Sequence, residues 1–491
     1  MGKGFSHGIK IMKMRPSFGL ESVALLLACS GVLKGEPLNI AKLHNYANQS
    51  VPAFVTKDNS VGYEITDNGA TLGRVLFYDK KLSVTNTVSC SSCHQQEYGF
   101  SDPAAKSVGV SGETQRHAMR LINIRYSDET KYFWDERAVT LEEQTTKPIQ
   151  DHIEMGYSGL DGNPDFGDLI TKLQGVDYYP ILFELAFGDP AITEDRVQIA
   201  LGQFVRSIQS FDSKYDIGRA QVTSNLDELP NFTLEENLGR YLFVEEMDVV
   251  VGEAEVPGPS GPVMMTVAQR LGGGMGCASC HKPPEFDIDP ESLNNGFSLG
   301  VGGEKDFAVT RSPTLRDMFN PSGELNGPMF HSGTVTDMDG IMAHYNFKDL
   351  DPDNPNLDPR LKPNGFPLFL DMDAGEQRQL KAFLKTLSGS DVYTNQKWSD
   401  PFDASGNLVV FNEIGIDALL YSVGAKEVSF ELSTMPGRTY SLWSSPDLSS
   451  GSWSVFQTGV PASSGSAKTL IGPFAFPDSP RAFFQLREET P

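Results

Sequence analysis

Cysteine is scarce in this 491-residue chain, which contains only five. Four of them form two tight C-x-x-C pairs, Cys90 with Cys93 and Cys277 with Cys280. A disulfide framework spreads its cysteines along a short chain, so this pattern argues against a disulfide-stapled scaffold. The fifth cysteine, Cys29, stands alone near the N-terminus.

The chain also has few positively charged residues relative to negative ones, and it has no long apolar stretch. Lys and Arg total 40 against 64 Asp and Glu, which gives a net charge of −24. Such a surface argues against binding to nucleic acid or an anionic membrane and suits a basic protein partner. No stretch approaches the roughly 20 consecutive apolar residues of a transmembrane helix. The hydrophobic content of 39% is typical of a globular protein, and the length suggests two to three domains.

The N-terminus has the parts of an export leader. Lys10, Lys13 and Arg15 precede a short apolar core, SVALLLACSG. Within it, LLAC, which ends at Cys29, resembles a bacterial lipoprotein box in which the cysteine carries a lipid. A plain cleaved signal is the alternative. In either case residues 1–36 form a leader outside the fold, and the mature protein is expected in the periplasm.

A histidine follows each cysteine pair directly, in CSSCH and CASCH. Attachment of haem c needs two nearby thiols for the vinyl groups and an adjacent imidazole for the iron, and C-x-x-C-H supplies all three. A four-thiolate zinc site would leave both histidines unexplained. A thioredoxin-like dithiol would need a βαβ context that neither motif has. The sequence therefore predicts two covalently bound haem c groups, with His94 and His281 as the proximal iron ligands.

Helical periodicity dominates residues 37–235 and residues 236–395, and each region carries one haem motif. The acidic, Pro/Gly-rich stretch 245–265 is expected to be a surface loop. Residues 400–491 alternate apolar and polar side chains between Pro, Gly and Ser, which predicts a small accessory antiparallel β domain. In TEDRVQIALGQFVRSIQSF and GEQRQLKAFLKTLSG the apolar residues share one helical face. These are Val197, Leu201, Phe204, Val205 and Ile208 in the first stretch, and Leu380, Phe383, Leu384 and Leu387 in the second.

Several ordered motifs follow the two haem motifs. RHAMRLINIRY and YFWDERAVTLEEQTTKPIQDHIEMG lie downstream of the first, and RSPTLRDMFN and NGPMFHSGTVTDMDGIMAHYN lie downstream of the second. Over residues 40–390 the chain resembles the bacterial di-haem cytochrome c peroxidase family, which includes the methylamine-utilisation di-haem enzyme. The resemblance implies a mainly α fold of two cytochrome c-like helical haem domains, to which this chain adds the C-terminal β domain. It also implies that the N-terminal haem meets peroxide and the C-terminal haem receives or shares electrons.

Three residues match the family's peroxide pocket. Trp134 matches the tryptophan between the haems, Gln144 the pocket glutamine and Glu154 the catalytic glutamate. Cleavage of an O–O bond needs a group that takes a proton from the near oxygen and returns it to the leaving one, and a partly buried carboxylate can do so. Gln144 can hydrogen-bond peroxide without competing for that proton. From the residues alone, other acids compete with Glu154, namely Asp135, Glu136, Glu142, Glu143 and Asp151.

Family members differ in the sixth ligand of the peroxide-binding haem. In some it is a histidine about sixteen residues past the proximal one, a place that Val110 takes here. The nearest histidine is His117, whose place in its motif favours a structural or inter-domain role. The first haem is therefore expected to be five-coordinate at rest and ready for peroxide without prior reduction.

The second haem has a different expected ligand. The family's sixth ligand lies about fourteen residues past the histidine of the HSG turn, His331, and that position is Tyr345. The peroxidases have methionine there and the methylamine-utilisation enzyme has tyrosine; anionic tyrosine lowers the potential and methionine raises it. Met342, one helical turn earlier, is the main alternative. His331 and Arg316 are expected to line this haem and its propionates.

The resemblance also implies a calcium ion between the haem domains. Its carbonyl ligands match Asn326 and Pro328. The side-chain ligand falls on His117, a poor calcium ligand, for which Asn123 is a possible substitute. The expected calcium site is thus only partly matched.

Three functional hypotheses follow. The first is a di-haem peroxidase that reduces hydrogen peroxide to water with electrons from a small periplasmic cytochrome c or cupredoxin. The second is a modifying oxidase that stores two oxidising equivalents across both haems, in a bis-ferryl-type state, and oxidises a partner protein. The missing distal histidine and Tyr345 favour the second, whereas the breadth of the family keeps the first ahead. The third, a non-catalytic electron carrier, requires two six-coordinate haems, and the Gln144–Glu154 pocket argues against it.

Overall fold

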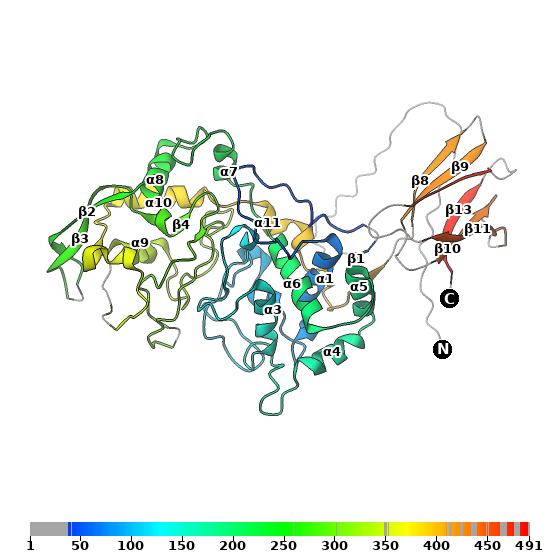
Figure 1. Cartoon of the computed structure of the whole chain (residues 1–491), viewed down its shortest axis with the longest axis horizontal. Coiled ribbons are helices and arrows are strands. Elements are labelled where there is room, and N and C mark those ends of the chain that lie inside the picture. The colour runs from blue at the N-terminus through cyan, green and yellow to red at the C-terminus, as the bar shows by residue number, and fades with distance from the viewer. Residues whose placement is uncertain are drawn as a thin grey trace. The chain divides into compact units, whose positions relative to one another are not determined.

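The computed structural model describes residues 38–489 except 41, 259, 301, 348–350, 352, 409, 412–414, 423–425, 434–438, 448, 450, 462–468 and 476–481. The chain divides into two compact units (Figure 1). The larger comprises residues 44–186 and 190–400 and contains both C-x-x-C-H motifs, and the smaller is built mainly from residues 401–491. The expected leader, residues 1–36 with Cys29, lies outside the described residues. No described helix is both long enough and apolar enough to span a membrane.

Among the residues that the structure describes, about 30% are helical, so the expected mainly α fold is not confirmed. Much of the larger unit consists of loops and small sheets between short helices (Figure 1). Eleven α-helices occur in the described residues: α1 (Asp67–Tyr78), α2 (Cys90–Cys93), α3 (Leu141–Gln150), α4 (Phe166–Gln174), α5 (Tyr178–Phe187), α6 (Glu194–Ser207), α7 (Lys214–Arg219), α8 (Leu234–Val244), α9 (Met338–Asn346), α10 (Ala374–Lys385) and α11 (Asp391–Thr394).

The first haem motif lies beside a packed pair of helices, α1 and α6. The predicted α6 is confirmed: Thr193 caps it by accepting a hydrogen bond from the backbone N–H of Arg196 at 3.3 Å, and its apolar face is buried. Gly73 of α1 allows close contact, because a Cβ there would lie 1.9 Å from the carbonyl oxygen of Ala200. A larger residue at Gly73 would therefore separate the two helices.

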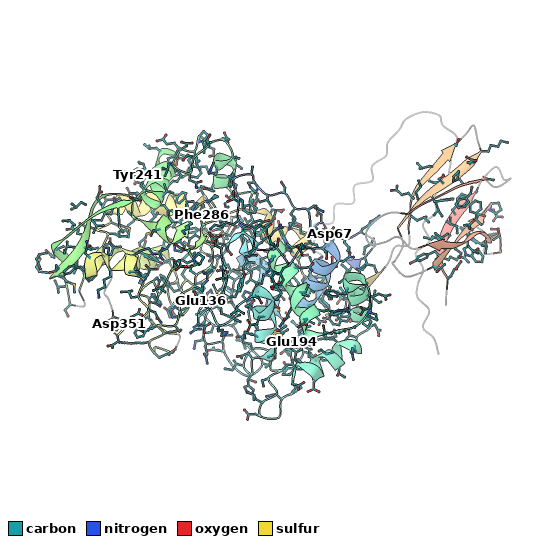
Figure 2. The ribbon with its side chains drawn as sticks, viewed as in Figure 1. Asp67, Glu136, Glu194, Tyr241, Phe286 and Asp351 are labelled. Atoms are coloured by element: carbon teal, nitrogen blue, oxygen red, sulfur yellow. The ribbon has the colours of Figure 1, made fainter. Side chains whose placement is uncertain are left out.

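A second helix pair, α8 and α10, repeats this arrangement near the second haem motif. The predicted α10 is confirmed, and Leu380, Phe383 and Leu384 are buried on its inner face. Gly239 of α8 is the contact point, because a Cβ there would lie 1.8 Å from the carbonyl oxygen of Gln379. The surrounding apolar cluster includes Phe286, which is fully buried and labelled in Figure 2.

The expected surface loop at 245–265 is instead a β-hairpin, so that prediction was wrong. Strands β2 (Met247–Val256) and β3 (Val263–Gly273) pair in antiparallel register from Met247↔Gly273 to Val256↔Val263. Strand β6 (Leu368–Phe369) adds to β3 in parallel. The Pro/Gly-rich segment that suggested a loop forms only the turn of this hairpin. Two short strands, β4 (His281–Lys282) and β5 (Asp287–Ile288), pair directly after the second haem motif.

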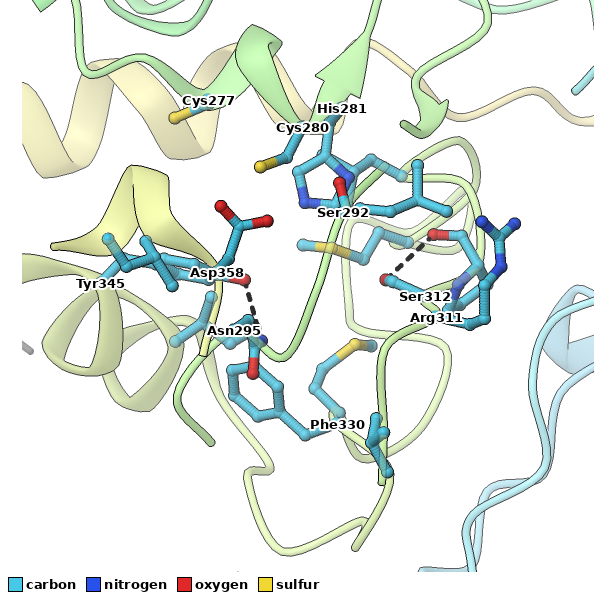
Figure 3. A pocket seen from close by; sticks show the side chains of 18 of the residues that line it. Cys277, Cys280, His281, Ser292, Asn295, Arg311, Ser312, Phe330, Tyr345 and Asp358 are labelled. Atoms are coloured by element: carbon cyan, nitrogen blue, oxygen red, sulfur yellow. Dashed lines mark hydrogen bonds between the residues drawn. The ribbon is translucent and has the colours of Figure 1, made fainter. Parts of the chain in front are cut away.

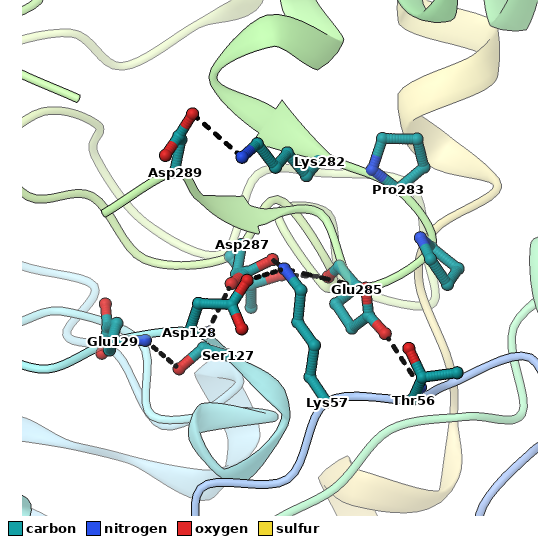
Figure 4. A network of polar contacts seen from close by, with 12 residues as sticks. Thr56, Lys57, Ser127, Asp128, Glu129, Lys282, Pro283, Glu285, Asp287 and Asp289 are labelled. Atoms are coloured by element: carbon teal, nitrogen blue, oxygen red, sulfur yellow. Dashed lines mark hydrogen bonds and ion pairs between the residues drawn. The ribbon is translucent and has the colours of Figure 1, made fainter. Parts of the chain in front are cut away.

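A buried ionic junction joins the N-terminal segment of the larger unit to both haem-motif regions (Figure 4). The Lys57 ammonium lies 2.7 Å from Asp287, 3.1 Å from Asp128 and 3.9 Å from Glu285. Thr56 donates its backbone N–H to Glu285 at 3.3 Å. Burial raises the pKa of the Glu285 and Asp287 carboxyls. Lys57 is therefore the cation that supports two buried acids.

The smaller unit confirms the predicted antiparallel β structure. One three-stranded sheet has the order β11-β10-β13 and the other β12-β9-β8, with every pairing antiparallel. Their inward side chains, such as Phe430, Leu442 and Phe484, form one apolar core. The strands of this unit are β7 (Val410–Phe411), which pairs with β1 (Leu38–Asn39), β8 (Gly415–Ser422), β9 (Glu427–Ser433), β10 (Thr439–Ser445), β11 (Ser454–Pro461), β12 (Thr469–Ala475) and β13 (Phe483–Glu488).

Candidate functional site

The first C-x-x-C-H motif forms the short helix α2, and His94 ends it by donating its backbone N–H to Cys90 at 3.0 Å. A tight turn with left-handed Gly99 and Phe100 brings the carbonyl oxygen of Phe100 to 3.1 Å from His94 Nδ1. Burial lowers the pKa of His94, which favours the neutral ring. With Nδ1 held by a carbonyl, Nε2 is the nitrogen left to bind a metal.

Beside this motif lies a cavity that also contains two of the predicted peroxide-pocket residues. Cys93, His94, Gln144 and Glu154 all line it. Gln144 belongs to α3 and faces the cavity with Pro148, one turn further along the same helix face. The structure therefore brings an imidazole, an amide and a carboxyl group to one cavity, although these residues lie up to 60 positions apart in the sequence.

Glu154 is the acid in this cavity with a strongly altered ionisation. Burial, and secondly the negative charge of Asp151, raises the pKa of Glu154 to about 7, whereas Arg137 opposes the shift. A carboxyl group with such a pKa can both accept and return a proton near neutral pH.

The competing acids have other partners. Glu142 is buried and paired with Arg206 of α6. Asp135 is bound by Arg116 and by Arg137. The remaining three are Glu136, paired with Lys131; Glu143, paired with Lys147; and Asp151, which accepts the backbone N–H groups of Ile153 and Glu154.

The segment that would carry a distal histidine in some relatives packs against the Glu154 loop. Val110 donates its backbone N–H to the carbonyl of Glu154 at 3.0 Å, and Ser111 donates to that of Ile153 at 3.1 Å. Gly109 is required at this contact, because a Cβ would lie 2.1 Å from the Ile153 carbonyl oxygen. This segment thus holds Glu154 in position through its backbone.

His117 links the two haem-motif regions. Its ring nitrogens lie 3.1 Å from the Ala104 carbonyl and 3.3 Å from the Ser101 hydroxyl. Its backbone N–H donates to the His331 carbonyl at 2.7 Å, and its own carbonyl accepts from the Trp134 indole at 2.7 Å. These contacts support the structural role expected for His117.

Trp134 lines both cavities, the one beside His94 and the one beside His281. Its carbonyl accepts the backbone N–H groups of Thr310 at 2.9 Å and Arg311 at 3.1 Å, and its ring meets His331 edge-on at 6.2 Å. Trp134 is therefore an aromatic side chain that the two cavities share.

The second C-x-x-C-H motif lies on a different local structure. Cys277 begins a 3-10 turn after left-handed Gly276, and His281 starts strand β4. Within the part of the chain that the structure describes, His281 Nδ1 is buried and makes no hydrogen bond. Burial, and secondly the charge of Arg360, lowers the pKa of His281 to about 4. The ring is therefore neutral and able to act as a metal ligand.

The second cavity contains both candidate sixth ligands. Figure 3 shows one of them, Tyr345, together with Cys277, Cys280 and His281. Tyr345 and Met342 lie one turn apart on α9, and both line the cavity with His281. The Asn295 amide donates to the Tyr345 hydroxyl at 3.2 Å. Burial raises the pKa of Tyr345 to about 12, and Asn295 opposes that shift. His331 lines the same cavity, as predicted.

Arg316 requires a correction, because it is not among the residues that line either cavity. Its fully buried guanidinium binds both oxygens of Asp216, at 3.1 and 2.9 Å, and the carbonyl of Pro284 at 2.7 Å. Because Asp216 already binds the Arg316 guanidinium through two hydrogen bonds, that guanidinium is not available for a haem propionate.

Two arginines that the sequence analysis missed do line the cavities. Arg120 borders both, and Arg311 borders the second and pairs with Glu129. Burial lowers the pKa of both, that of Arg311 to about 10. Among the described residues, the Nε atoms of Arg120 and Arg311 are buried without a hydrogen-bond partner. Buried guanidinium groups with unused donors fit the carboxylates of a haem.

The chemistry of the two sites fits haem c. Cys277, Cys280 and His281 line the second cavity, and Cys93 and His94 line the first, with Cys90 in the same short helix α2. The two cysteine pairs thus serve separate cavities rather than one four-thiolate centre. At the expected calcium position, the Asn326 amide donates to the Asp317 carbonyl and the Tyr393 hydroxyl, both at 2.7 Å. Pro328 lines the second cavity. The amide of Asn123 is bound on both sides by the Ser210 backbone, so it is not free to replace a calcium ligand.

Comparison with known proteins agrees with this chemistry. The family model for di-haem cytochrome c peroxidase matches residues 67–221, which span the first motif and its pocket. Residues 67–221 therefore belong to the di-haem cytochrome c peroxidase family. The family implies two haem c groups, one for each C-x-x-C-H motif.

Relatives within this family carry two kinds of name. Methylamine utilization protein MauG of Methylorubrum extorquens is 28% identical over 66% of this chain and 79% of its own length. Cytochrome c551 peroxidase of Nitrosomonas europaea is 25% identical over 65% and 80%. The crystal structure of a MauG-like protein associated with microbial copper homeostasis has a TM-score of 0.53, with 24% identity over 72% of this chain and 99% of that chain. That last likeness concerns the fold.

Proposed function

We propose that this protein is a di-haem peroxidase that reduces hydrogen peroxide to water with electrons from a small redox protein. The observation that carries the proposal is the raised pKa of Glu154, about 7, in the cavity that His94 and Gln144 also line. Peroxide, two electrons and two protons yield two waters. Glu154 takes the proton of the near peroxide oxygen and returns it to the leaving oxygen, so that water departs rather than hydroxide.

The other residues of the pocket position the substrate. The Gln144 amide donates a hydrogen bond to peroxide and cannot take its proton. A haem bound here would supply the redox chemistry, and His94 would hold its iron, while the face of the cavity lined by Gln144 and Glu154 would receive the substrate. Because Val110 replaces a distal histidine and its backbone is bound to the Glu154 loop, we propose that this face is open at rest.

A second candidate function is a modifying oxidase that oxidises a partner protein. Tyr345 at the second cavity, with its hydroxyl bound by Asn295, favours this function, because a tyrosine ligand stabilises oxidised iron. Trp134, which lines both cavities, would allow both sites to share oxidising equivalents. Export to the periplasm, a lipid on Cys29 and a calcium ion near Asn326 and Pro328 belong to the proposal as further expectations.

Stopped-flow spectroscopy of the as-isolated ferric protein, carrying both haems, tests the open face. We expect an immediate spectral change on mixing with peroxide. If the change requires prior addition of one electron, the open face is refuted. Steady-state oxidation of a reduced cytochrome c then separates the two functions, because a peroxidase turns over with such a donor and a modifying oxidase consumes little of it.

A further inference from the structure

The β2–β3 hairpin exposes a cluster of apolar side chains. Met264 is 65% exposed and Leu271 69% exposed. The full set of strongly exposed apolar residues in this hairpin is Val250, Val251, Val263, Met264, Met265 and Leu271. Exposed apolar groups that gather on one element, rather than singly, indicate an interaction surface. We call the two strands, residues 247–256 and 263–273, the hairpin patch.

Negative charge surrounds this patch. Residues 245–273 contain five acids and one base, Arg270, so their net charge is −5 + 1 = −4. The guanidinium of Arg270 is bound to Glu376 at 2.7 Å and to two backbone carbonyls. By cross-strand register, Glu253 and Glu255 lie on the same hairpin face as Met264. Apolar and acidic groups are therefore mixed on one exposed face.

The base of the hairpin is continuous with the second haem motif. Strand β3 ends at Gly273, and the four residues to Cys277 span at most about 14 Å. Met247, the first residue of β2, lines the second cavity together with Cys277. The backbone N–H of Gly274 donates to the Glu246 carbonyl at 2.7 Å, which fixes this base. A protein seated on the patch would lie next to the second site.

The far part of the hairpin is also held in place. Ala254, Val256 and Val267 form a small buried core with Phe369 of β6. The patch is thus a supported surface, and the partner would not have to order it.

We propose that the hairpin patch is the docking surface for the electron donor, and that this donor is a small basic one-electron redox protein. This inference rests on the proposed function. Opposite charges steer diffusional encounter, and a small apolar contact allows rapid release. Met264, on the same face as Glu253 and Glu255, can adapt its shape to the partner. A competing explanation is that the acids only protect an exposed edge strand from pairing with other chains.

Charge reversal in the full-length, haem-loaded protein separates these explanations. The probe is reduced mitochondrial cytochrome c, a lysine-rich protein. For Glu253→Lys/Glu255→Lys we expect KM at low salt to rise about tenfold and its dependence on ionic strength to flatten. The matched control is Glu64→Lys/Asp195→Lys, which makes the same charge change at exposed sites near α1 and on α6 and should shift KM less than about twofold.

An uncharged variant tests the apolar part of the patch. For Met264→Ser we expect a KM increase of about threefold with an unchanged salt dependence. The inference is overturned if the hairpin and control variants shift KM equally, or if neither does. It also fails if cytochrome c is not oxidised at any salt concentration.

The reaction with peroxide in the absence of an electron donor tests the proposed function alone, whereas oxidation of cytochrome c also tests the docking surface. Both hairpin variants should show the wild-type rate of spectral change with peroxide, which also reports that they are folded. If the wild-type protein itself does not react with peroxide, the proposed function fails, whatever the patch binds.

Discussion

The two C-x-x-C-H sites share a motif and differ in almost everything around it. His94 ends a helix and has its Nδ1 held by the Phe100 carbonyl, whereas His281 starts a strand and has a buried Nδ1 that makes no hydrogen bond within the described residues. The first cavity faces Gln144 and Glu154, and the second faces Met342 and Tyr345. The motif is therefore the same at both sites, while the side chains around it differ: an amide and a carboxyl group at the first cavity, a thioether and a phenol at the second.

The largest expected effect is on the rate of the peroxide reaction at the first site, where Glu154 is expected to transfer protons. For Glu154→Gln we expect the peroxide reaction to slow by about 100- to 10,000-fold, because the amide cannot carry the proton. With a pKa of about 7, wild-type Glu154 is increasingly protonated below that pH and cannot accept a proton. The rate should therefore fall about tenfold per pH unit below 7, and the variant should lose this dependence.

The control for this prediction is Glu143→Gln. Glu143 is exposed on the same helix as Gln144 and is paired with Lys147 at 2.8 Å. Stopped-flow spectra at several pH values measure both variants. A wild-type rate for Glu154→Gln, or an equal loss for Glu143→Gln, would contradict the assignment of Glu154.

The next effect concerns ligation at the second site. If Tyr345 is the ligand, Tyr345→Phe should raise the potential of that haem by on the order of 100 mV, about a fifty-fold change in its reduction equilibrium. Met342→Leu is the matched control and should leave the potential nearly unchanged. Redox titration followed by visible absorption measures both. The reverse result would identify Met342 as the ligand.

A smaller effect is expected on the rate of electron exchange between the two sites. For Trp134→Phe we expect electron exchange between the haems to slow by about tenfold, because the indole that borders both cavities is lost. Trp398→Phe is the control, since Trp398 is also buried but borders neither cavity. Rapid-mixing measurements of half-reduced protein report the exchange. Equal rates in both variants would exclude Trp134 as the path.

The smallest effect tests how Glu154 is held. Gly109→Ala places a Cβ against the Ile153 carbonyl and should lower stability by about 1–3 kcal/mol while slowing the peroxide reaction only a few-fold. Gly252→Ala in β2 is the control, because its Cβ would meet nothing within 4 Å. Thermal unfolding and stopped-flow spectra measure both variants. An unchanged stability for Gly109→Ala would contradict this prediction, because it would show that the Ile153 backbone moves away from the added Cβ at no cost in free energy.

Short-range sequence patterns correctly predicted the elements whose structure is determined by neighbouring residues. The haem motifs, the capped α6 and α10, and the antiparallel strands of the smaller unit all follow from short-range spacing. The hairpin was missed because its turn is rich in Pro and Gly, and because the strands carry the acids that usually mark loops. Alternation such as that of Glu253, Ala254, Glu255 and Val256 was the signal that could have found it.

The site residues were harder to predict because their roles depend on ion pairs between residues that are far apart in the sequence. Arg316 was expected at a propionate, but the buried carboxylate of Asp216, 100 residues earlier, holds it instead. The residues alone left Glu154 as one acid among several. What distinguishes it is that Glu142 and Asp135 are neutralised by arginines from other segments, and no local pattern shows this. Arg120 and Arg311 were missed for the same reason.

The Lys57 junction has a consequence for how the molecule holds together. Removing residues beyond 235 would leave Lys57 without Glu285 and Asp287, and the complementary fragment would bury two acids without their cation. The two haem-bearing parts should therefore melt in one transition rather than two. A gene divided between residues 235 and 236 should yield two fragments that are soluble only when they associate. The Lys57 junction would then be a condition for assembly as well as a contact between the two parts.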